Sequence, residues 1–203
     1  MKKAISVANI LKYNPRLMPF EGKWFDSFGC PEMRGCWIVW GASGSGKTRF
    51  ALQLAKYLTI FGRVVYNSLE EGLSLSFKRA FIETGMASAK HFSLLDKEPI
   101  ADLTKRIELK KSPDIYIVDS VQYSGLSKEA AKKLVDEHKS KLFIFISHAE
   151  GYNPKGCVAQ AIRYYSDVKL FVEGYKISSP VSRFKEGVCQ PFVIWEEGAK
   201  FNL

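Results

Sequence analysis

Short hydrophobic runs alternate with longer amphipathic segments along most of the chain. The runs are rich in β-branched and aromatic side chains, which predicts buried strands, and apolar residues at three- and four-residue spacing between them predict helices. The predicted strands are residues 36–40, 63–69, 91–95, 114–119, 141–147, 168–172 and 188–195, and the predicted helices are residues 48–61, 73–84, 99–111 and 127–138. Residues 151–156 and 178–187 are predicted to be loops.

Alternating strands and helices are typical of a parallel sheet, because each parallel connection must cross from one end of the sheet to the other. The predicted strands are continuous apolar runs, which indicates burial on both faces. We therefore expect an α/β fold with a mainly parallel sheet and helices on both faces. Residues 1–34 show no clear periodicity, so we expect an irregular N-terminal lead-in before one domain over residues 35–203.

The composition is that of a folded protein with an excess of positive charge. Hydrophobic residues are 46% and aromatic residues 13% of the chain, which excludes a disordered chain. Thirty Lys and Arg residues against 21 Asp and Glu residues leave a net charge of +9. This charge favours an acidic partner such as a nucleotide or a nucleic acid without requiring one.

The cysteines and the apolar segments indicate a cytoplasmic protein. Cys30, Cys36, Cys157 and Cys189 form no C-x-x-C pair, so we expect reduced thiols rather than a zinc site. No signal peptide is recognisable, and no window approaches the ~18 apolar residues that a membrane helix needs. We therefore expect no membrane partner.

The segment GASGSGKT at residues 41–48 matches the phosphate-loop pattern G-x-x-x-x-G-K-[ST]. Its members are Gly41, Ala42, Ser43, Gly44, Ser45, Gly46, Lys47 and Thr48. Glycines let the backbone curl so that N–H groups converge on phosphate oxygens at the start of the next helix. In this pattern Lys47 meets the β- and γ-phosphates and Thr48 holds Mg²⁺. The alternative is a flexible glycine turn between a strand and a helix.

Acidic residues end two of the predicted strands. Asp119 ends the run DIYIVD and is the candidate for holding the Mg²⁺ shell, the alternative being a cap of the following turn. Glu70 follows the run RVVYNSL and is the candidate general base, with Glu71 as its competitor; either could instead be a first-turn helix acid. His148 ends the fourth strong strand, where it senses a γ-phosphate or satisfies a buried carbonyl.

Together these motifs resemble the RecA-like P-loop ATPases. The similarity is greatest to the core domain of the RadA/Sms DNA-repair family, followed by the DnaB-type helicase core and KaiC-like proteins. It rests on YNSLEEGLSLSFKRA at residues 66–80, PDIYIVDSVQ at 113–122, the Ser-His pair at 147–148, LFVEG at 170–174 and the Arg-Phe pair at 183–184. This ordered series spans residues 35–195 and is more specific than the phosphate loop alone.

The resemblance implies an ATPase that uses ATP and Mg²⁺ and works as a homo-oligomeric ring or filament. Lys47, Glu70 and His148 would act on the nucleotide of their own subunit, while Arg183 would reach a neighbour's γ-phosphate as an arginine finger. Repair, recombination and replication of DNA are the implied roles.

The resemblance also implies a single-stranded DNA site on two loops, residues 122–127 and 149–158. Tyr123 and Tyr152 would stack on bases and Lys155 would meet a phosphate. The alternative for both loops is an ordinary flexible connection.

The sequence departs from that family at several points. Val181 and Ser182 stand where the family has Lys-Asn, Ala149 follows His148 in place of the family's continuation, and the zinc-binding C-x-x-C pairs have no counterpart. Binding of DNA is therefore less firmly indicated than binding of ATP. A KaiC-like regulatory module without DNA binding and a P-loop small-molecule kinase are the alternative functions.

Overall fold

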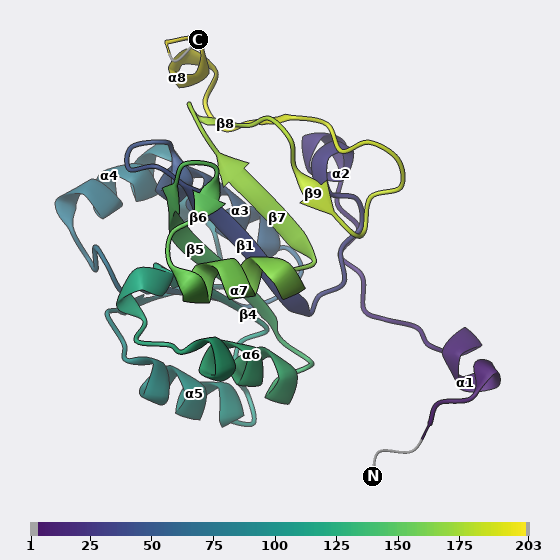
Figure 1. The fold of residues 1–203 in the computed structure, drawn as a ribbon. Coiled ribbons are helices and arrows are strands. Elements are labelled where there is room, and N and C mark those ends of the chain that lie inside the picture. Colours follow the sequence, from purple (N-terminus) through teal and green to yellow (C-terminus); the bar gives the residue numbers. More distant parts are fainter. Residues whose placement is uncertain (1–3, 202–203) are drawn as a thin grey trace.

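The structure is a computed structural model that describes residues 4–201, and its centre is a mostly parallel sheet (Figure 1). The sheet strands run in the order β3-β2-β4-β5-β1-β7-β9, in which only β9 is antiparallel to its neighbour. Their bounds are β1 Gly35–Gly41, β2 Val64–Ser68, β3 Phe92–Asp96, β4 Ile115–Asp119, β5 Leu142–Glu150, β7 Val168–Val172 and β9 Val181–Ser182. A short strand, β6 (Asn153–Pro154), turns back on β5, and β8 (Lys176–Ile177) pairs with β10 (Phe192–Val193).

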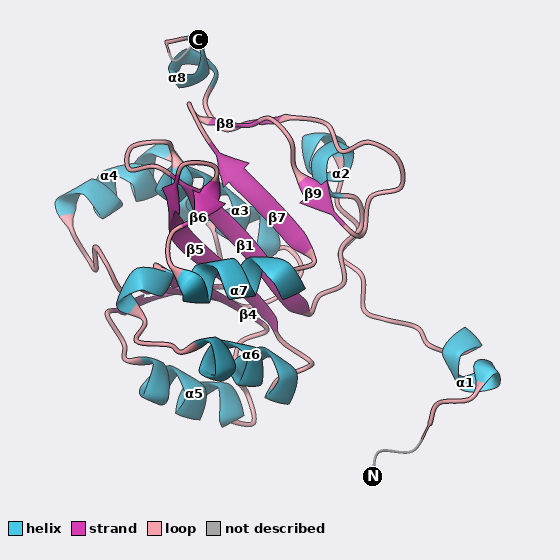
Figure 2. Cartoon of the chain, in the orientation of Figure 1, coloured by secondary structure: helices cyan, strands magenta, loops and turns pink. Residues whose placement is uncertain are grey.

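Helices cover both faces of the sheet (Figure 2). One face packs against α2 (Gly22–Phe28), α3 (Lys47–Leu58) and α4 (Leu75–Glu83), and the other against α5 (Ile100–Glu108), α6 (Lys128–Glu137) and α7 (Cys157–Tyr165). Two short helices, α1 (Val7–Leu11) and α8 (Glu196–Lys200), lie toward the ends of the chain. The predicted α/β fold with a mainly parallel sheet is confirmed.

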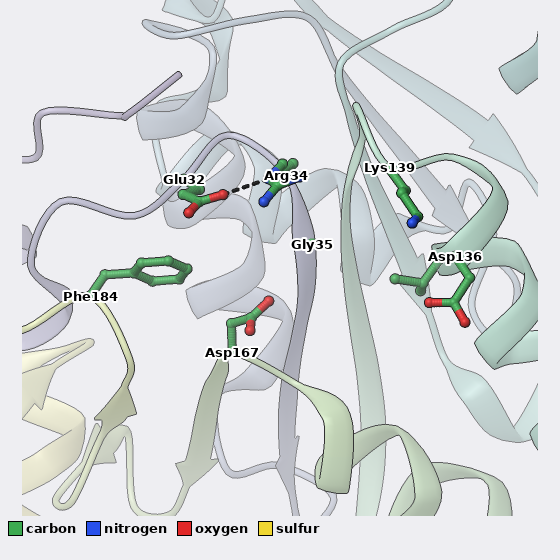
Figure 3. Close-up of a pocket in the computed structure, with 8 residues that line it drawn as sticks. Glu32, Arg34, Gly35, Asp136, Lys139, Asp167 and Phe184 are labelled. Carbon is green, nitrogen blue, oxygen red and sulfur yellow. Dashed lines mark hydrogen bonds and ion pairs between the residues drawn. The ribbon is translucent and has the colours of Figure 1, made fainter. Parts of the chain in front are cut away.

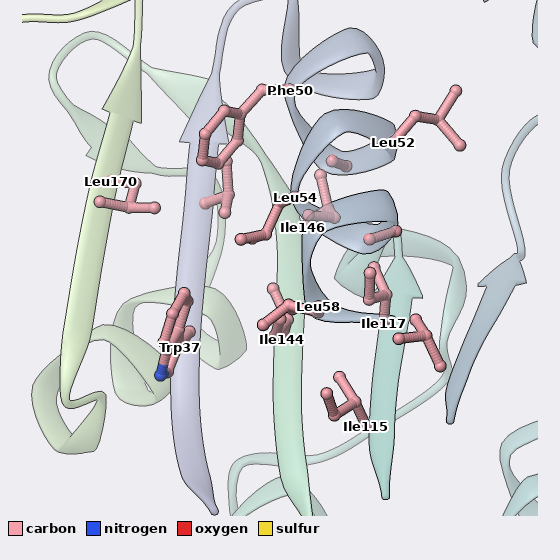
Figure 4. Close-up of a cluster of buried hydrophobic side chains, with 14 of the residues drawn as sticks. Trp37, Phe50, Leu52, Leu54, Leu58, Ile115, Ile117, Ile144, Ile146 and Leu170 are labelled. Atoms are coloured by element: carbon pink, nitrogen blue, oxygen red, sulfur yellow. The ribbon is translucent and has the colours of Figure 1, made fainter. Parts of the chain in front are cut away.

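Helix α3, which directly follows the glycine loop, packs against the centre of the sheet (Figure 4). Phe50, Leu54 and Leu58 recur every four residues and therefore share one face of the helix. They are fully buried in the same cluster as Trp37 of β1 and Ile144 of β5. Burying each of these side chains contributes about 1.5–3 kcal/mol, so the start of α3 is rigidly supported.

The N-terminal residues contribute to this core more than their lack of periodicity indicates. Met18, Phe20 and Phe28 are at most 3% exposed and belong to the cluster on the α3 face. Over its described part, residues 4–34, the segment expected to be an irregular lead-in holds two helices: α2 packs on the core, and α1 buries no residue.

Three sequence expectations differ from the structure near the C-terminus. Helix α7 occupies a stretch for which no helix is predicted, and the expected loop 178–187 contains β9. The expected strand 188–195 shrinks to Phe192–Val193, because Pro191 has no N–H to donate to a ladder and ends the pairing. Over residues 4–201, no helix is long and apolar enough to cross a membrane.

Candidate functional site

The phosphate-loop pattern forms a tight turn between β1 and α3. Gly44 and Gly46 have φ values of 74° and 102°, in the left-handed region that favours glycine. A Cβ on Gly46 would lie 2.7 Å from the ring of Tyr175, so a side chain there would collide with a neighbour. The backbone therefore needs glycine for both conformation and space, as a loop that curls around an anion does.

The residues of this loop fit a nucleotide phosphate. The loop leads into the N-terminus of a 12-residue helix, whose first backbone N–H groups and dipole attract negative charge. The hydroxyl of Ser45 is buried and, among the described residues, has no hydrogen-bond partner. A cavity of about 270 Å³ adjoins the loop at Ala42 and Ser45 and is bordered by Tyr152.

A magnesium ion here would share its ligands with phosphate. The described residues contain no group of three or more His, Cys, Asp or Glu side chains that could hold a metal ion by themselves. Mg²⁺ commonly keeps several waters and binds through one or two protein groups plus substrate phosphates. Thr48 in the first turn of α3 and Asp119 at the end of β4 fit that incomplete ligand set.

The sheet register brings the other candidates to the same edge. β5 lies between β1 and β4, with His148 level with Gly41, and Asp119 level with Ile146. β2 follows on the other side of β4, with Ser68 level with Asp119. Because these strands are parallel, their carboxyl ends meet beside the phosphate loop.

Asp119 is a partly buried carboxylate beside other charges. The hydroxyl of Tyr66 donates a hydrogen bond to its Oδ2. Burial raises the pKa of Asp119 to about 6, and the negative charge of Glu70 adds to that rise, while the Tyr66 hydrogen bond and the Lys47 cation oppose it. Asp119 is therefore mostly ionised at neutral pH, and it becomes protonated when the pH falls through about 6.

Lys47 points its ammonium group back into the loop. Its Nζ donates to the carbonyl oxygen of Ala42 at 2.7 Å. Burial lowers the pKa of Lys47, and the carboxylates of Asp119 and Glu70 oppose the shift. A phosphate oxygen would offer this partly buried cation a full negative charge in place of a carbonyl dipole.

Glu70 and Glu71 face different surroundings. Glu70 Oε2 accepts a hydrogen bond from Ser120 Oγ at 3.0 Å and lies 2.9 Å from His148 Nε2. Glu71 Oε1 accepts from the hydroxyls of Ser74 and Ser76 at the start of α4. Glu70 is thus joined to the candidate site, whereas Glu71 supports a helix N-terminus.

Gln122 links the turn after β4 to the end of β5. Its amide nitrogen donates to Ser147 Oγ and to the carbonyl of Lys155, each at 2.9 Å, and its oxygen accepts from the backbone N–H of His148 at 3.1 Å. The expected loop 122–127 therefore begins with a residue that positions His148.

The sequence interpretation did not single out Tyr66 or Ser120 as site residues. The Tyr66 hydroxyl contacts the carboxylate of Asp119, although Tyr66 itself is level with Ile117. Ser120 follows Asp119 in sequence and donates to Glu70. Tyr66 is a hydroxyl-bearing side chain in the middle of the apolar strand β2, and Ser120 is the first residue after β4, next to a residue already singled out.

Arg183 is not brought together with the other candidates. It follows β9 at the amino end of the sheet, where its guanidinium donates to Asp167 Oδ1 at 3.3 Å, and its side chain is 63% exposed. A neighbouring pocket of about 210 Å³ includes Glu32, Arg34 and Asp167 (Figure 3). The phosphate loop of the same chain begins at the opposite, carboxyl end of β1. Because β1 has seven residues, that loop lies ~20 Å from the end of the sheet where Arg183 stands.

The prediction of a DNA-binding loop over residues 149–158 is wrong about its conformation, because the structure has a hairpin and the start of a helix there. β5 continues to Glu150, pairs with Asn153 and Pro154 in a hairpin, and α7 begins at Cys157. The indole N–H of Trp40 donates to the Tyr152 carbonyl at 3.0 Å, which ties the turn of this hairpin to β1.

The aromatic rings proposed to stack on bases remain accessible. Tyr152 is 76% exposed and Tyr123 is 59% exposed, and Lys155 is also exposed.

Chemically, the site combines a cationic phosphate loop, a carboxylate at the end of β4 and a Glu-His pair. No protein-family model matches the chain, and comparison with curated proteins found no match.

Proposed function

We propose that this chain is a Mg²⁺-dependent, RecA-like ATPase of DNA metabolism that works as an oligomer on single-stranded DNA. The observation that carries the proposal is the arrangement of Lys47, Asp119, Glu70 and His148 at one sheet edge, beside a glycine loop that fits phosphate. The strand order supports it further, because β5 inserts His148 between the phosphate loop and Asp119.

Each residue has a distinct role in the proposed hydrolysis. The ammonium group of Lys47 stabilises negative charge on the β- and γ-phosphates, and the carboxylate of Asp119 holds the metal's water shell with the hydroxyl of Thr48. Bound Mg²⁺ would supply charge neutralisation of the phosphates.

Glu70 is proposed as the general base. Its carboxylate accepts a proton from the attacking water, and the hydrogen bonds from Ser120 and His148 keep that carboxylate in one orientation. A catalytic group held in this manner loses less entropy at the moment of reaction, so its effect on the rate is larger.

Arg183 would act on another subunit. Because it stands at the far end of the sheet from its own phosphate loop, it serves catalysis only where a second copy brings it to a neighbour's nucleotide. This is the reason that the proposed enzyme is an oligomer.

The test is the rate of phosphate release from ATP, measured with and without Mg²⁺ and with and without single-stranded oligo(dT). We expect Mg²⁺-dependent turnover that rises with oligo(dT) and is lost in Lys47→Ala. Lys128→Ala, an exposed lysine on α6, is the matched control and keeps wild-type turnover. Equal turnover in Lys47→Ala would contradict the phosphate-loop assignment.

The DNA part is tested separately by fluorescence anisotropy of labelled oligo(dT) over a salt series. Lys155→Ala should weaken binding and lower the salt slope by about one charge, and Tyr152→Ala should cost about 1–3 kcal/mol if the ring stacks on a base. ATP turnover without any oligo(dT) binding at low salt would replace the DNA role by a nucleotide-dependent regulatory one.

A further inference from the structure

A polar groove of about 480 Å³, the α7–β7 groove, opens beside helix α7. It lies on the face of the sheet that α7 covers, where β7 is followed by the edge strand β9 (Figure 1). A volume of this size accommodates a small ligand or a segment of a longer one. Its side chains come from the β5–β6 hairpin, α7 and β7, and they are Asn153, Gln160, Arg163, Tyr164 and Lys169.

The charge of this groove is positive and uncompensated. Two of its side chains are cations, and over residues 4–201 none of its lining side chains is a carboxylate. Within the same residues, Arg163 donates only to the amide oxygen of Asn153, and the side chain of Lys169 has neither a hydrogen-bond nor an ion-pair partner. Two lysines of α6, by contrast, pair with acidic residues one turn along the helix. Two unpaired cations in one hollow attract an anion.

The guanidinium of Arg163 is held in one place. It lies 4.9 Å from the centre of the Trp40 ring, and one of its N–H groups donates to Asn153 Oδ1 at 2.6 Å. Trp40 is itself fixed, because it is 4% exposed and its indole N–H donates to the Tyr152 carbonyl. A guanidinium carries five N–H donors in a planar fork that matches two phosphate oxygens. Because the remaining donors of Arg163 are oriented in advance, binding a phosphate costs less entropy.

The other groups in the groove suit the rest of a nucleotide. Asn153 and Gln160 are exposed carboxamides, which can both donate and accept hydrogen bonds. The ring of Tyr164 is 83% exposed, so a base can stack on it. Cations combined with an accessible aromatic ring are typical of a surface that binds single strands without sequence preference.

The groove adjoins the hairpin surface proposed to contact DNA. Tyr152 stands in the turn of the β5–β6 hairpin, and the next residue, Asn153, lines the groove. A strand bound at the hairpin therefore has the groove beside it. A free phosphate ion would use the cations alone, whereas a strand would also use the carboxamides and the ring of Tyr164. The set of side chains favours a strand.

We infer that the α7–β7 groove binds the sugar-phosphate backbone of a single nucleic-acid strand, with Arg163 and Lys169 on phosphates and Tyr164 against a base. Both cations lie outside residues 122–127 and 149–158, the two segments in which the sequence predicts DNA contacts. The inference rests on the proposed function, because it assigns a further part of the strand's path. Phosphate contacts carry no sequence information, so strands of different sequence bind here alike.

The experiment measures fluorescence anisotropy of a labelled oligo(dT) of about 16 nucleotides with the full chain, over a salt series and without ATP. Lys169→Gln should lower the slope of log affinity against log salt by about 0.7, and Arg163→Gln/Lys169→Gln should lower it by about 1.4. Lys169→Gln decides the result if the double variant unfolds, because this lysine has no partner to lose within the described part of the chain.

Three controls accompany these variants. Lys110→Gln/Lys111→Gln removes two charges from exposed lysines after α5, outside the groove, and should keep the wild-type slope. Tyr164→Ala should weaken binding at every salt concentration and leave the slope unchanged, because a stacked ring carries no charge. Inorganic phosphate should displace the oligo(dT) no better than chloride does at the same ionic strength.

Four results would overturn the inference. The first is a wild type that does not bind oligo(dT) at low salt, and the second is an unchanged slope in Lys169→Gln. The third is an equal loss of slope in Lys110→Gln/Lys111→Gln, which would reduce the effect to net charge. The fourth is stronger displacement by phosphate than by chloride, which would make the groove a site for free phosphate.

Lys155→Ala, measured in parallel, separates this inference from the proposed function. A lower slope in Lys155→Ala together with an unchanged slope in Lys169→Gln would refute the groove and keep the hairpin as the DNA site. The reverse pattern would refute the hairpin contact and support the groove. Because the measurement contains no ATP, the rate of ATP turnover tests the proposed ATPase independently.

Discussion

The two ends of the central sheet carry charge in different ways. At the carboxyl end, Glu70, His148, Asp119 and Lys47 influence one another within a partly buried site, and burial shifts the pKa values of the last two. At the amino end, Arg183 pairs with Asp167 while its side chain is 63% exposed.

The difference matters because the same charges interact more strongly where water is excluded. Exposed ion pairs typically contribute 0–1 kcal/mol, and salt screens them, whereas a partly buried set also changes protonation and orientation. Substitutions at the carboxyl end should therefore alter chemistry, and those at the amino end should alter it only through another molecule.

The largest effect tests that contrast directly. Arg183→Ala should leave the fold intact and lower ATP turnover roughly 10³-fold, because an arginine finger stabilises charge on the γ-phosphate. Mixing it with Lys47→Ala should restore activity, since a mixed interface joins one copy's intact loop to the other's intact arginine. Wild-type turnover in Arg183→Ala would reduce this residue to a surface ion pair.

A smaller effect separates two adjacent residues. Glu70→Gln should slow hydrolysis about 10²-fold or more while ATP still binds, because an amide does not accept the proton. Glu71→Gln should keep near wild-type turnover and lower thermal stability slightly, because Glu71 accepts from Ser74 and Ser76 at a helix start. Single-turnover hydrolysis and nucleotide binding measure both. The reverse pattern would move the general base by one residue.

The smallest effect concerns pH. Asp119 must be ionised to hold a metal shell, so turnover should fall as pH drops through about 6, the raised pKa of this carboxyl. Tyr66→Phe removes a hydrogen bond that favours the carboxylate, so it should raise this pKa further and shift the acid limb upward by about one pH unit or less.

The matched control for that shift is Tyr116→Phe, a buried tyrosine on the opposite face of the sheet, which should leave the limb in place. The measurement is turnover from pH 5 to 8 at saturating ATP. An unmoved limb in Tyr66→Phe would mean that a different group limits activity at low pH.

The sequence identified most of the sheet and missed elements whose ends carry weak signals. Continuous apolar runs located β1, β2, β4 and β5 to within a few residues, because a strand buried on both faces has little choice of side chain. Helix α7 escaped because it begins without a side-chain cap or an acidic first turn, although Ala159 and Ile162 lie at helical spacing and are buried. The strand expected at 188–195 failed at Pro191.

By itself, the sequence determined the local chemistry: a glycine loop ahead of a helix, and carboxylates at the ends of apolar strands. Only the tertiary structure decided which groups meet. Strand order inserted His148 beside Glu70, register aligned Ser68 with Asp119, and sheet length separated Arg183 from its own loop. The pattern of apolar and polar residues indicates which positions are buried and which conformation the backbone adopts. Hydrogen-bond partners that lie more than a hundred residues apart, such as Cys36 and Asp167, depend instead on how the strands and helices pack together.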